Sequence, residues 1–235
     1  MGSSYQQFCP VAKAMELLDE RWTLLVIREL LSGSRHFNEL RRGVPRMSPT
    51  LLSKRLNRLV LAGVVHRQDD GDQVHYLLTQ AGLELRPIVE ALGAWGTRWI
   101  GELGDEDLDP ALLLWDMRRN IDHAATPPGR TVVLFRFPEV PAKSRHWWLV
   151  IAEGEADVCD FDPGHEVAVT VESSLRGMVG VWRGDLRWAD ALRSGDLTIQ
   201  GPQDLRRMVP AWFILSGFAE IPRAELRGAP GPSSL

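Results

Sequence analysis

The chain has 235 residues, of which 44% are hydrophobic, and a formal net charge of −4 at pH 7. This composition excludes a disordered or fibrous chain and is sufficient for the cores of two modest domains. No apolar run reaches the length of a membrane span and no basic leader precedes an apolar stretch, so we expect a cytoplasmic protein. Cys9 and Cys159, the two cysteines, are too few for a disulfide framework or a metal cluster.

The acidic total conceals an uneven distribution of charge. Residues 1–103 carry 13 Lys+Arg and 11 Asp+Glu, whereas residues 104–235 carry 14 and 20. Between Arg35 and Arg67, eight cations accompany a single acid, Glu39. A local excess of positive charge is typical of a surface that contacts phosphates, so double-stranded DNA is the expected partner of the N-terminal half.

Three helices are predicted in the N-terminal half. The segments 22–33, which Gly33 ends, and 36–44 precede a third helix that begins at Ser48. The Ser48 hydroxyl can accept hydrogen bonds from the unpaired amides of the first turn, and Pro49 lacks only an N–H that would have no partner there.

The third helix has an apolar face and a basic face. Its apolar residues recur at helical spacing: Leu52, Leu56, Leu59 and Val60. At about 100° per residue, Thr50, Lys54 and Arg58 share the opposite face. A small hydroxyl and two cations can enter a major groove, with base edges near the helix N-terminus and phosphates farther along. The alternative is an amphipathic helix with a merely solvated basic face.

A two-stranded hairpin is predicted directly after this helix, between Gly63 and Thr79, with its turn at Asp69–Asp72. The order of three helices and a hairpin predicts a winged helix-turn-helix. Residues 9–100 resemble the DNA-binding domain of the HxlR-type transcriptional regulators. The resemblance is carried by Cys9-Pro10, Trp22-Thr23, Phe37–Leu40, Ser48, Leu52, Leu56, Leu59, Gly63–Val65, Tyr76, Leu78, Thr79 and Gly82.

The turn of the hairpin departs from this family, because wing tips in this class often carry neutral or basic residues. We therefore expect Arg67 and His75 on the strands, rather than the acidic tip, to contact phosphate. The full set of predicted DNA contacts is Arg41, Arg42, Arg46, Ser48, Thr50, Leu51, Lys54, Arg55, Arg58, Arg67 and His75. Replacing Lys54 or Arg58 by Ala is expected to weaken operator binding, the second with a shallower dependence on salt.

Residues 79–101 are predicted to form a helix whose apolar stripe is too large for a small wing domain to cover. The stripe consists of Ile88, Leu92, Trp95 and Trp99. Gly93 and Gly96 would allow another backbone to approach closely. We expect a homodimer that reads a palindrome, and the family resemblance adds Phe8 and Val11 to its interface. Packing of the stripe against the chain's own second domain is the alternative.

The predicted domains are a DNA-binding and dimerisation domain at 1–103, an acidic hinge at 104–109, an α+β domain at 110–222 and a flexible tail at 223–235. In the α+β domain, a helix at 112–122 precedes an antiparallel meander with strands at 131–138, 146–153, 155–161 and 166–172. Helices at 174–195, a strand at 197–201 and a helix at 202–218 complete it.

The arrangement resembles the sterol-carrier-protein type-2-like fold, whose core holds a tunnel for apolar ligands. The matching residues are Trp182–Gly184, Ala191, Leu192, Gly195, Leu197, Ile199, Gly201 and Leu205.

Six of the nine tryptophans lie in this second domain, which favours a cavity for a small apolar effector. The predicted lining is Trp115, Phe135, Trp148, Met178, Trp182, Trp212 and Phe213. Arg118 or Arg136 could meet a polar end of the ligand. The alternative is that these rings simply fill the core.

Two other functions, an enzyme and a redox sensor, are the alternatives to a ligand-controlled regulator. An enzyme is disfavoured, because the sequence has no HExxH motif, no G-x-S-x-G elbow and no Gly-rich loop after a strand, and no cofactor is expected. A redox sensor would act through Cys9, since the resembling family includes regulators with a reactive cysteine near this position. Cys9 precedes Pro10 at the positive end of a helix dipole, but an inert cysteine is the alternative.

Overall fold

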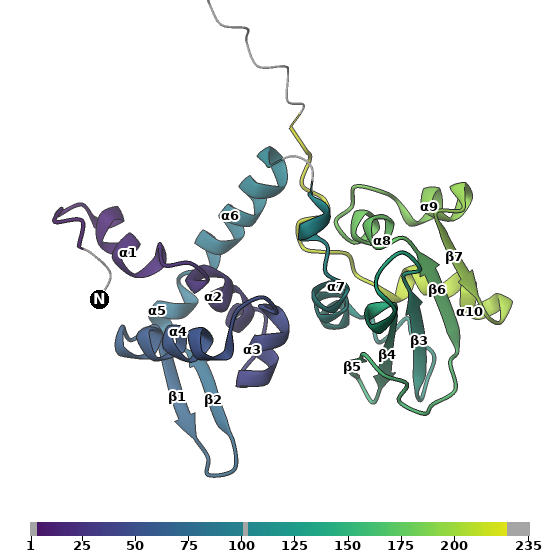
Figure 1. Ribbon diagram of the computed structural model, residues 1–235, viewed down its shortest axis with the longest axis horizontal. Helices are drawn as coiled ribbons and strands as arrows, with labels where there is room; N and C mark the ends of the chain where they lie inside the picture. The colour runs from purple at the N-terminus through teal and green to yellow at the C-terminus, as the bar shows by residue number, and fades with distance from the viewer. Residues whose placement is uncertain (1–3, 101–102, 225–235) are drawn as a thin grey trace, which may run out of the picture. The chain divides into compact units, whose positions relative to one another are not determined.

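The structure, a computed structural model, describes residues 4–100 and 103–224 and divides into two units, residues 1–92 and 93–235 (Figure 1). Among these described residues, no helix combines the length and the apolar character needed to cross a bilayer. Apart from Arg223 and Ala224, the tail predicted at 223–235 lies outside the described residues.

The first unit is a winged helix-turn-helix, which confirms the predicted order of three helices and a hairpin. Its elements are α1 (Pro10–Leu18), α2 (Thr23–Leu31), α3 (Phe37–Gly43), α4 (Pro49–Leu61), β1 (Val65–Asp69), β2 (Val74–Leu78), α5 (Gln80–Leu83) and α6 (Arg86–Trp99), the last of which runs on into the second unit. The antiparallel hairpin of β1 and β2 pairs Val65 with Leu78 and Asp69 with Val74 (Figure 1).

The core of this unit explains why α4 presents one particular face outward. Leu52, Leu56 and Leu59 are fully buried against α2 and α3 residues such as Val26 and Leu40. Burying each such side chain stabilises the fold by about 1.5–3 kcal/mol, so the helix cannot rotate about its axis without losing that contribution.

The single helix predicted at 79–101 is wrong, because the structure breaks it into α5 and α6. Thr79 accepts a hydrogen bond from the Gly82 amide at 3.3 Å and so caps α5. Pro87 disfavours helical backbone at the residue before it and has no N–H to bond to the previous turn. Pro87 therefore sits near the start of a new helix, where the missing N–H has no intrahelical partner.

The second unit contains one five-stranded sheet with the order β5-β4-β3-β6-β7. Its elements are η1 (Asp105–Asp107), α7 (Pro110–Met117), η2 (Arg118–Asn120), β3 (Thr131–Arg136), η3 (Ala142–Ser144), β4 (His146–Ala152), β5 (Glu155–Cys159), β6 (Val169–Ser173), α8 (Leu175–Trp182), α9 (Trp188–Ser194), β7 (Leu197–Gln200), α10 (Gln203–Met208) and η4 (Val209–Trp212). Helices and a sheet that follow one another in this way make an α+β unit, as predicted.

The predicted antiparallel meander is wrong, because the sheet is mixed. Strand β6 lies beside β3 rather than β5, and the pair is parallel, with Phe135 opposite Val171. Strand β5 exposes Glu155 and Asp157 and forms an edge, whereas β6 buries alternate residues and lies inside the sheet. Alternation in the sequence identifies each strand but does not encode its neighbour.

Three helix ends in this unit also differ from the predictions. The helix predicted at 112–122 ends at Met117 and continues only as the 3-10 turn η2. Helix α7 begins earlier, at Pro110, because the Asp109 carboxylate accepts hydrogen bonds from the Ala111 and Leu112 amides. The helix predicted at 202–218 ends at Met208 and continues only as a 3-10 turn that contains Pro210.

Candidate nucleic-acid interface

Helix α4 begins as its sequence predicts. The Ser48 hydroxyl accepts a hydrogen bond from the Leu51 amide at 3.3 Å, and Pro49 occupies the first helical position. This cap fixes the first turn, where the residues that reach base edges are expected. Leu51, a predicted contact, is half-buried and packs against the core.

The outer face of α4 is open to solvent. Thr50, Ser53, Lys54 and Asn57 are all exposed. In the described part of the chain, none of these four side chains has a hydrogen-bond or ion-pair partner. Ser53 and Asn57 were not among the predicted contacts, although they follow Thr50 by three and seven residues and therefore share its face. We name these four residues the α4 reading face.

Arg55 and Arg58 are engaged within the protein. Arg58 donates to the Glu20 carboxylate at 2.5 Å and to the Glu16 carbonyl oxygen at 2.7 Å. Arg55 forms an ion pair with Glu20 and donates to the Arg21 carbonyl oxygen at 3.1 Å. The exposed fractions of the two side chains are 12% for Arg55 and 28% for Arg58. The two arginines thus fasten α4 to the corner between α1 and α2, and Lys54 is the predicted α4 cation whose charge is left for a partner.

A hollow of about 680 Å³ lies between α1 and α4. It is lined by the α4 reading face together with Arg58, Leu61 and, from α1, Glu16. Hydrogen bonds from Lys13 and then Ser4 hold the pKa of the Glu16 carboxyl below its usual value, so Glu16 is ionised at neutral pH. The end of the hollow that carries Lys54 is therefore the end that favours a phosphate.

The α3 region adds further positive charge. Arg41, Arg42 and Arg46 are exposed, as is Ser48. Glu39, the single acid of the segment 35–67, accepts hydrogen bonds from the Arg35 and His36 amides at 2.7 and 3.0 Å. These two bonds hold the Glu39 carboxylate at the N-terminus of α3, where a negative charge is stabilising.

Acids accompany the cations of the wing. Arg67 is exposed but forms an ion pair with Asp69 at 3.1 Å. His75 lies 3.4 Å from a carboxylate oxygen of Asp70, and its ring centroid is 4.4 Å from that of His36. The wing therefore presents less positive charge than α3 and α4.

Apolar residues are exposed on α1 and along α6. Phe8 is fully exposed and Val11 largely so, and Cys9 between them is a partly exposed free thiol at the N-cap of α1. Helix α6 buries none of its residues completely, and its predicted stripe is about half-exposed: Ile88, Leu92, Trp95 and Trp99. At Gly93, a Cβ would lie 2.2 Å from the Phe218 ring, so the space there is already occupied.

The sequence comparisons identify the family. The sequence pattern of the HxlR-like helix-turn-helix family matches residues 17–103. The uncharacterised HTH-type transcriptional regulator YvaP of Bacillus subtilis is 38% identical over 98 residues, which make up 40% of this chain and 91% of YvaP. The chain belongs to the HxlR-like helix-turn-helix family. It is a DNA-binding transcriptional regulator of that family.

Two further comparisons cover a similar share of this HxlR-like chain. The uncharacterised HTH-type regulator Rv3095 of Mycobacterium tuberculosis is 42% identical over 95 residues, 38% of this chain and 58% of the relative. Among solved structures, the reduced form of the transcriptional regulator YodB from B. subtilis is 32% identical and covers 38% of this chain and 92% of YodB, with a TM-score of 0.34.

Beyond the family match, the seven residues predicted to line a ligand cavity contribute largely to the interior of the second unit. Six are buried and Trp148 is half-buried: Trp115, Phe135, Met178, Trp182, Trp212 and Phe213 are the buried ones. The Phe135 and Phe213 rings meet edge to face, with centroids 6.0 Å apart. Arg118 stacks on the Trp115 ring at 3.6 Å and Arg136 forms an ion pair with Glu172, so both arginines have partners of their own.

Proposed function

We propose that this HxlR-like regulator binds DNA as a homodimer and that the α4 reading face enters the major groove of each half of a palindromic operator. The observation that carries the proposal is the exposure of Thr50, Ser53, Lys54 and Asn57 on a helix whose other face is fixed in the core. The hydroxyl, amide and ammonium groups of these side chains can form hydrogen bonds with base edges and phosphates.

We assign two different roles to the predicted contacts. Arg41, Arg42 and Arg46 are suited to phosphates beside the groove, because they are exposed near the start of α4. Arg55 and Arg58 act as positioning residues, since their guanidinium groups are bound to Glu20 and to backbone oxygens. They hold the angle at which α4 leaves the α1–α2 corner.

The dimer would form through the apolar residues of α1 and α6. A stripe of half-exposed Ile, Leu and Trp side chains with a fully exposed Phe8 is costly to leave in water. A two-fold axis through these helices places two copies of α4 on one DNA duplex, with half-sites about 10 base pairs or a multiple of that apart.

The oligomeric state and the symmetry of the DNA site can be tested together. Duplexes selected from a randomised library by the full chain are expected to contain an inverted repeat bound by two protomers. Trp95→Glu should give a monomer by sedimentation equilibrium, whereas Phe161→Glu, which changes an exposed ring that belongs to neither α1 nor α6, should leave the dimer unchanged. Selection of asymmetric sites by a monomeric parent protein would overturn the proposal.

We also propose that the second unit is sterol-carrier-like and that a small ligand bound there changes DNA affinity. The α+β arrangement and the number of tryptophans support a ligand-binding unit. Because the predicted lining residues are largely buried in the packed core, a ligand site on the surface of this unit is the simpler arrangement.

A further inference from the structure

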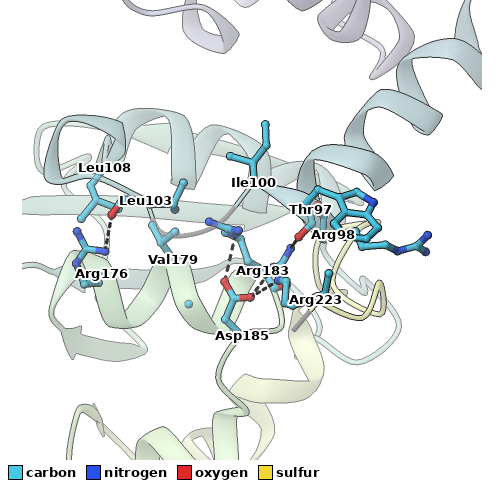
Figure 2. Close-up of a pocket in the computed structure, with 13 residues that line it drawn as sticks. Thr97, Arg98, Ile100, Leu103, Leu108, Arg176, Val179, Arg183, Asp185 and Arg223 are labelled. Carbon is cyan, nitrogen blue, oxygen red and sulfur yellow. Dashed lines mark hydrogen bonds and ion pairs between the residues drawn. The ribbon is translucent and has the colours of Figure 1, made fainter. Parts of the chain in front are cut away.

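The second unit contains a hollow of about 670 Å³ along one face of α8 (Figure 2). Helix α8 buries Leu175, Met178 and Val181 in the core, together with Trp182. Arg176 lies three and four residues before Val179 and Gly180, which in turn lie four and three residues before Arg183, so these four residues form the opposite face, which lines the hollow.

The hollow has an apolar wall. Leu103, Leu108 and Val179 lie together at one side in Figure 2, and Ile100 and Trp99 complete the apolar lining. Gly180 leaves the centre open, because a Cβ at this position would meet only Leu186, at 3.8 Å. An apolar body of modest size can therefore lie along the middle of α8.

Four arginines and one acid line the same hollow: Arg98, Arg176, Arg183, Arg223 and Asp185. Arg223 is saturated, since it donates to Asp185 at 2.7 Å, to the Thr97 carbonyl oxygen at 2.7 Å and to the Arg183 carbonyl oxygen at 3.3 Å. Arg223 thereby ties the chain segment after α10 to α6 and to the end of α8, and forms a fixed edge of the hollow.

Arg183 is the arginine placed to receive a ligand. Its Nε lies 3.3 Å from Asp185, whereas among the described residues its two terminal nitrogens have no partner. Figure 2 shows Arg183 between Val179 and Arg223, next to the apolar wall. Arg98 on the rim is exposed, and within the described ranges its side chain has no partner either. Arg176 is bound to Asp105, which is 94% exposed, and to the Leu103 carbonyl oxygen.

We propose that this hollow binds an amphipathic monocarboxylate, with the carboxylate on Arg183 and the apolar body against Leu103, Leu108 and Val179. The two terminal nitrogens of a guanidinium can each donate a hydrogen bond to one of the two oxygens of a carboxylate. Asp185 already neutralises part of the positive charge, so a single negative charge fits better than a phosphate dianion. A neutral ligand of the same shape leaves the Arg183 donors without a charged acceptor.

The regulatory consequence rests on the proposed function, whereas the binding site does not. Trp99 and Arg98 belong both to the hollow and to α6, which we propose as part of the dimer surface. A ligand that prefers one arrangement of this helix would change dimerisation, and through it DNA affinity, by linkage.

Titration calorimetry of the full chain with decanoate tests the site. We expect 1-decanol and acetate each to bind at least about tenfold more weakly than decanoate, because each lacks one half of the interaction. Arg183→Met and Arg98→Ala should weaken decanoate binding, and Gly180→Leu should block it by filling the hollow. The control Arg207→Ala removes an exposed arginine of the same unit that does not line the hollow and should bind as the parent does.

If Arg183→Met unfolds, Arg98→Ala still tests the site, because among the described residues the Arg98 side chain makes no hydrogen bond or ion pair that folding would lose. Equal affinity for decanoate and decanol, or parent-like binding by both Arg98→Ala and Gly180→Leu, would overturn the site. Binding that depends on these residues but leaves DNA affinity unchanged would uphold the site and reject ligand control of DNA binding.

Discussion

Helices α4 and α8 share the same local features but lie in different surroundings. Each begins at a serine, Ser48 for α4 and Ser174 for α8, whose hydroxyl accepts a hydrogen bond from the backbone amide three residues later. Each buries an apolar stripe and turns cations outward. The outward face of α4 carries polar side chains that have no partner among the described residues, whereas the outward face of α8 is bordered by Leu103, Leu108 and the Arg223 edge.

The difference shows that an amphipathic basic helix does not define a function by itself. The groups that the rest of the chain places beside the helix determine which ligand it can bind. Each hollow is lined by one acid, Glu16 beside α4 and Asp185 beside α8, so the acids do not separate them. The exposed polar side chains of the α4 reading face suit a polyanion, whereas the apolar wall beside α8 suits a small amphipathic anion.

The largest effect is expected at the inner faces, where the two helices are alike. Leu56→Ala in α4 and Met178→Ala in α8 each remove a fully buried side chain. Each should lower the free energy of unfolding of its own unit by about 2–5 kcal/mol, because transfer and cavity terms add. Urea denaturation followed by circular dichroism measures this loss. Leu61→Ala, at an 89% exposed position of α4, is the control and should change stability little.

The next largest effect is on DNA binding and concerns Lys54 on the outer face of α4, because the outer face of α8 is not expected to contact DNA. Lys54→Ala should weaken operator binding by about 1–3 kcal/mol and make its salt dependence shallower by about one unit, with no change in stability. Fluorescence anisotropy over a range of salt concentrations measures both. Lys143→Ala removes one charge from an exposed position of the second unit and controls for the change in net charge. Parent-like affinity of Lys54→Ala at every salt concentration would exclude Lys54 from the interface.

A smaller effect is expected for Arg58→Ala, and of a different kind. Because Arg58 is held by Glu20 and the Glu16 carbonyl oxygen, its loss should lower the free energy of unfolding of the first unit by about 1–2 kcal/mol. DNA affinity should fall only through misplacement of α4, and the salt dependence should keep the parent slope. A shallower slope with unchanged stability would instead make Arg58 a phosphate contact.

Lys54 and Arg58 also show how much of the candidate site could be predicted from the sequence. The spacing of Leu52, Leu56 and Leu59 was enough to predict which α4 residues face the core. The partner of Arg58 could not be predicted, because Glu20 lies 38 residues earlier and meets it only after α1, α2 and α4 pack together. Spacing orients a side chain, but tertiary contacts decide whether its charge remains available.

The second unit shows the same limit more strongly. Its strands were found from alternation and composition, but the parallel pairing of β3 and β6 depends on long-range contacts. The hollow beside α8 brings together Leu103, Val179 and Arg223, which are separated by more than 40 residues at each step. The number of tryptophans directed the prediction to the core, whereas among the described residues the hollow beside α8 is lined by four arginines and one acid together with apolar side chains, of which only Trp99 is a tryptophan.

The smallest effect is expected at the two caps, and it tests whether the helices share their local design. Ser48→Ala and Ser174→Ala each remove the acceptor for one amide of the first turn, at 3.3 and 3.0 Å. Each should cost about 1 kcal/mol of stability in its own unit, measured by urea denaturation. Ser48→Ala should in addition weaken DNA binding, because the first turn of α4 carries Thr50 at the reading face, whereas Ser174→Ala should leave DNA affinity unchanged. Equal effects of the two variants on DNA affinity would mean that the cap of α4 contributes to folding alone, and that the base-reading turn lies farther along the helix.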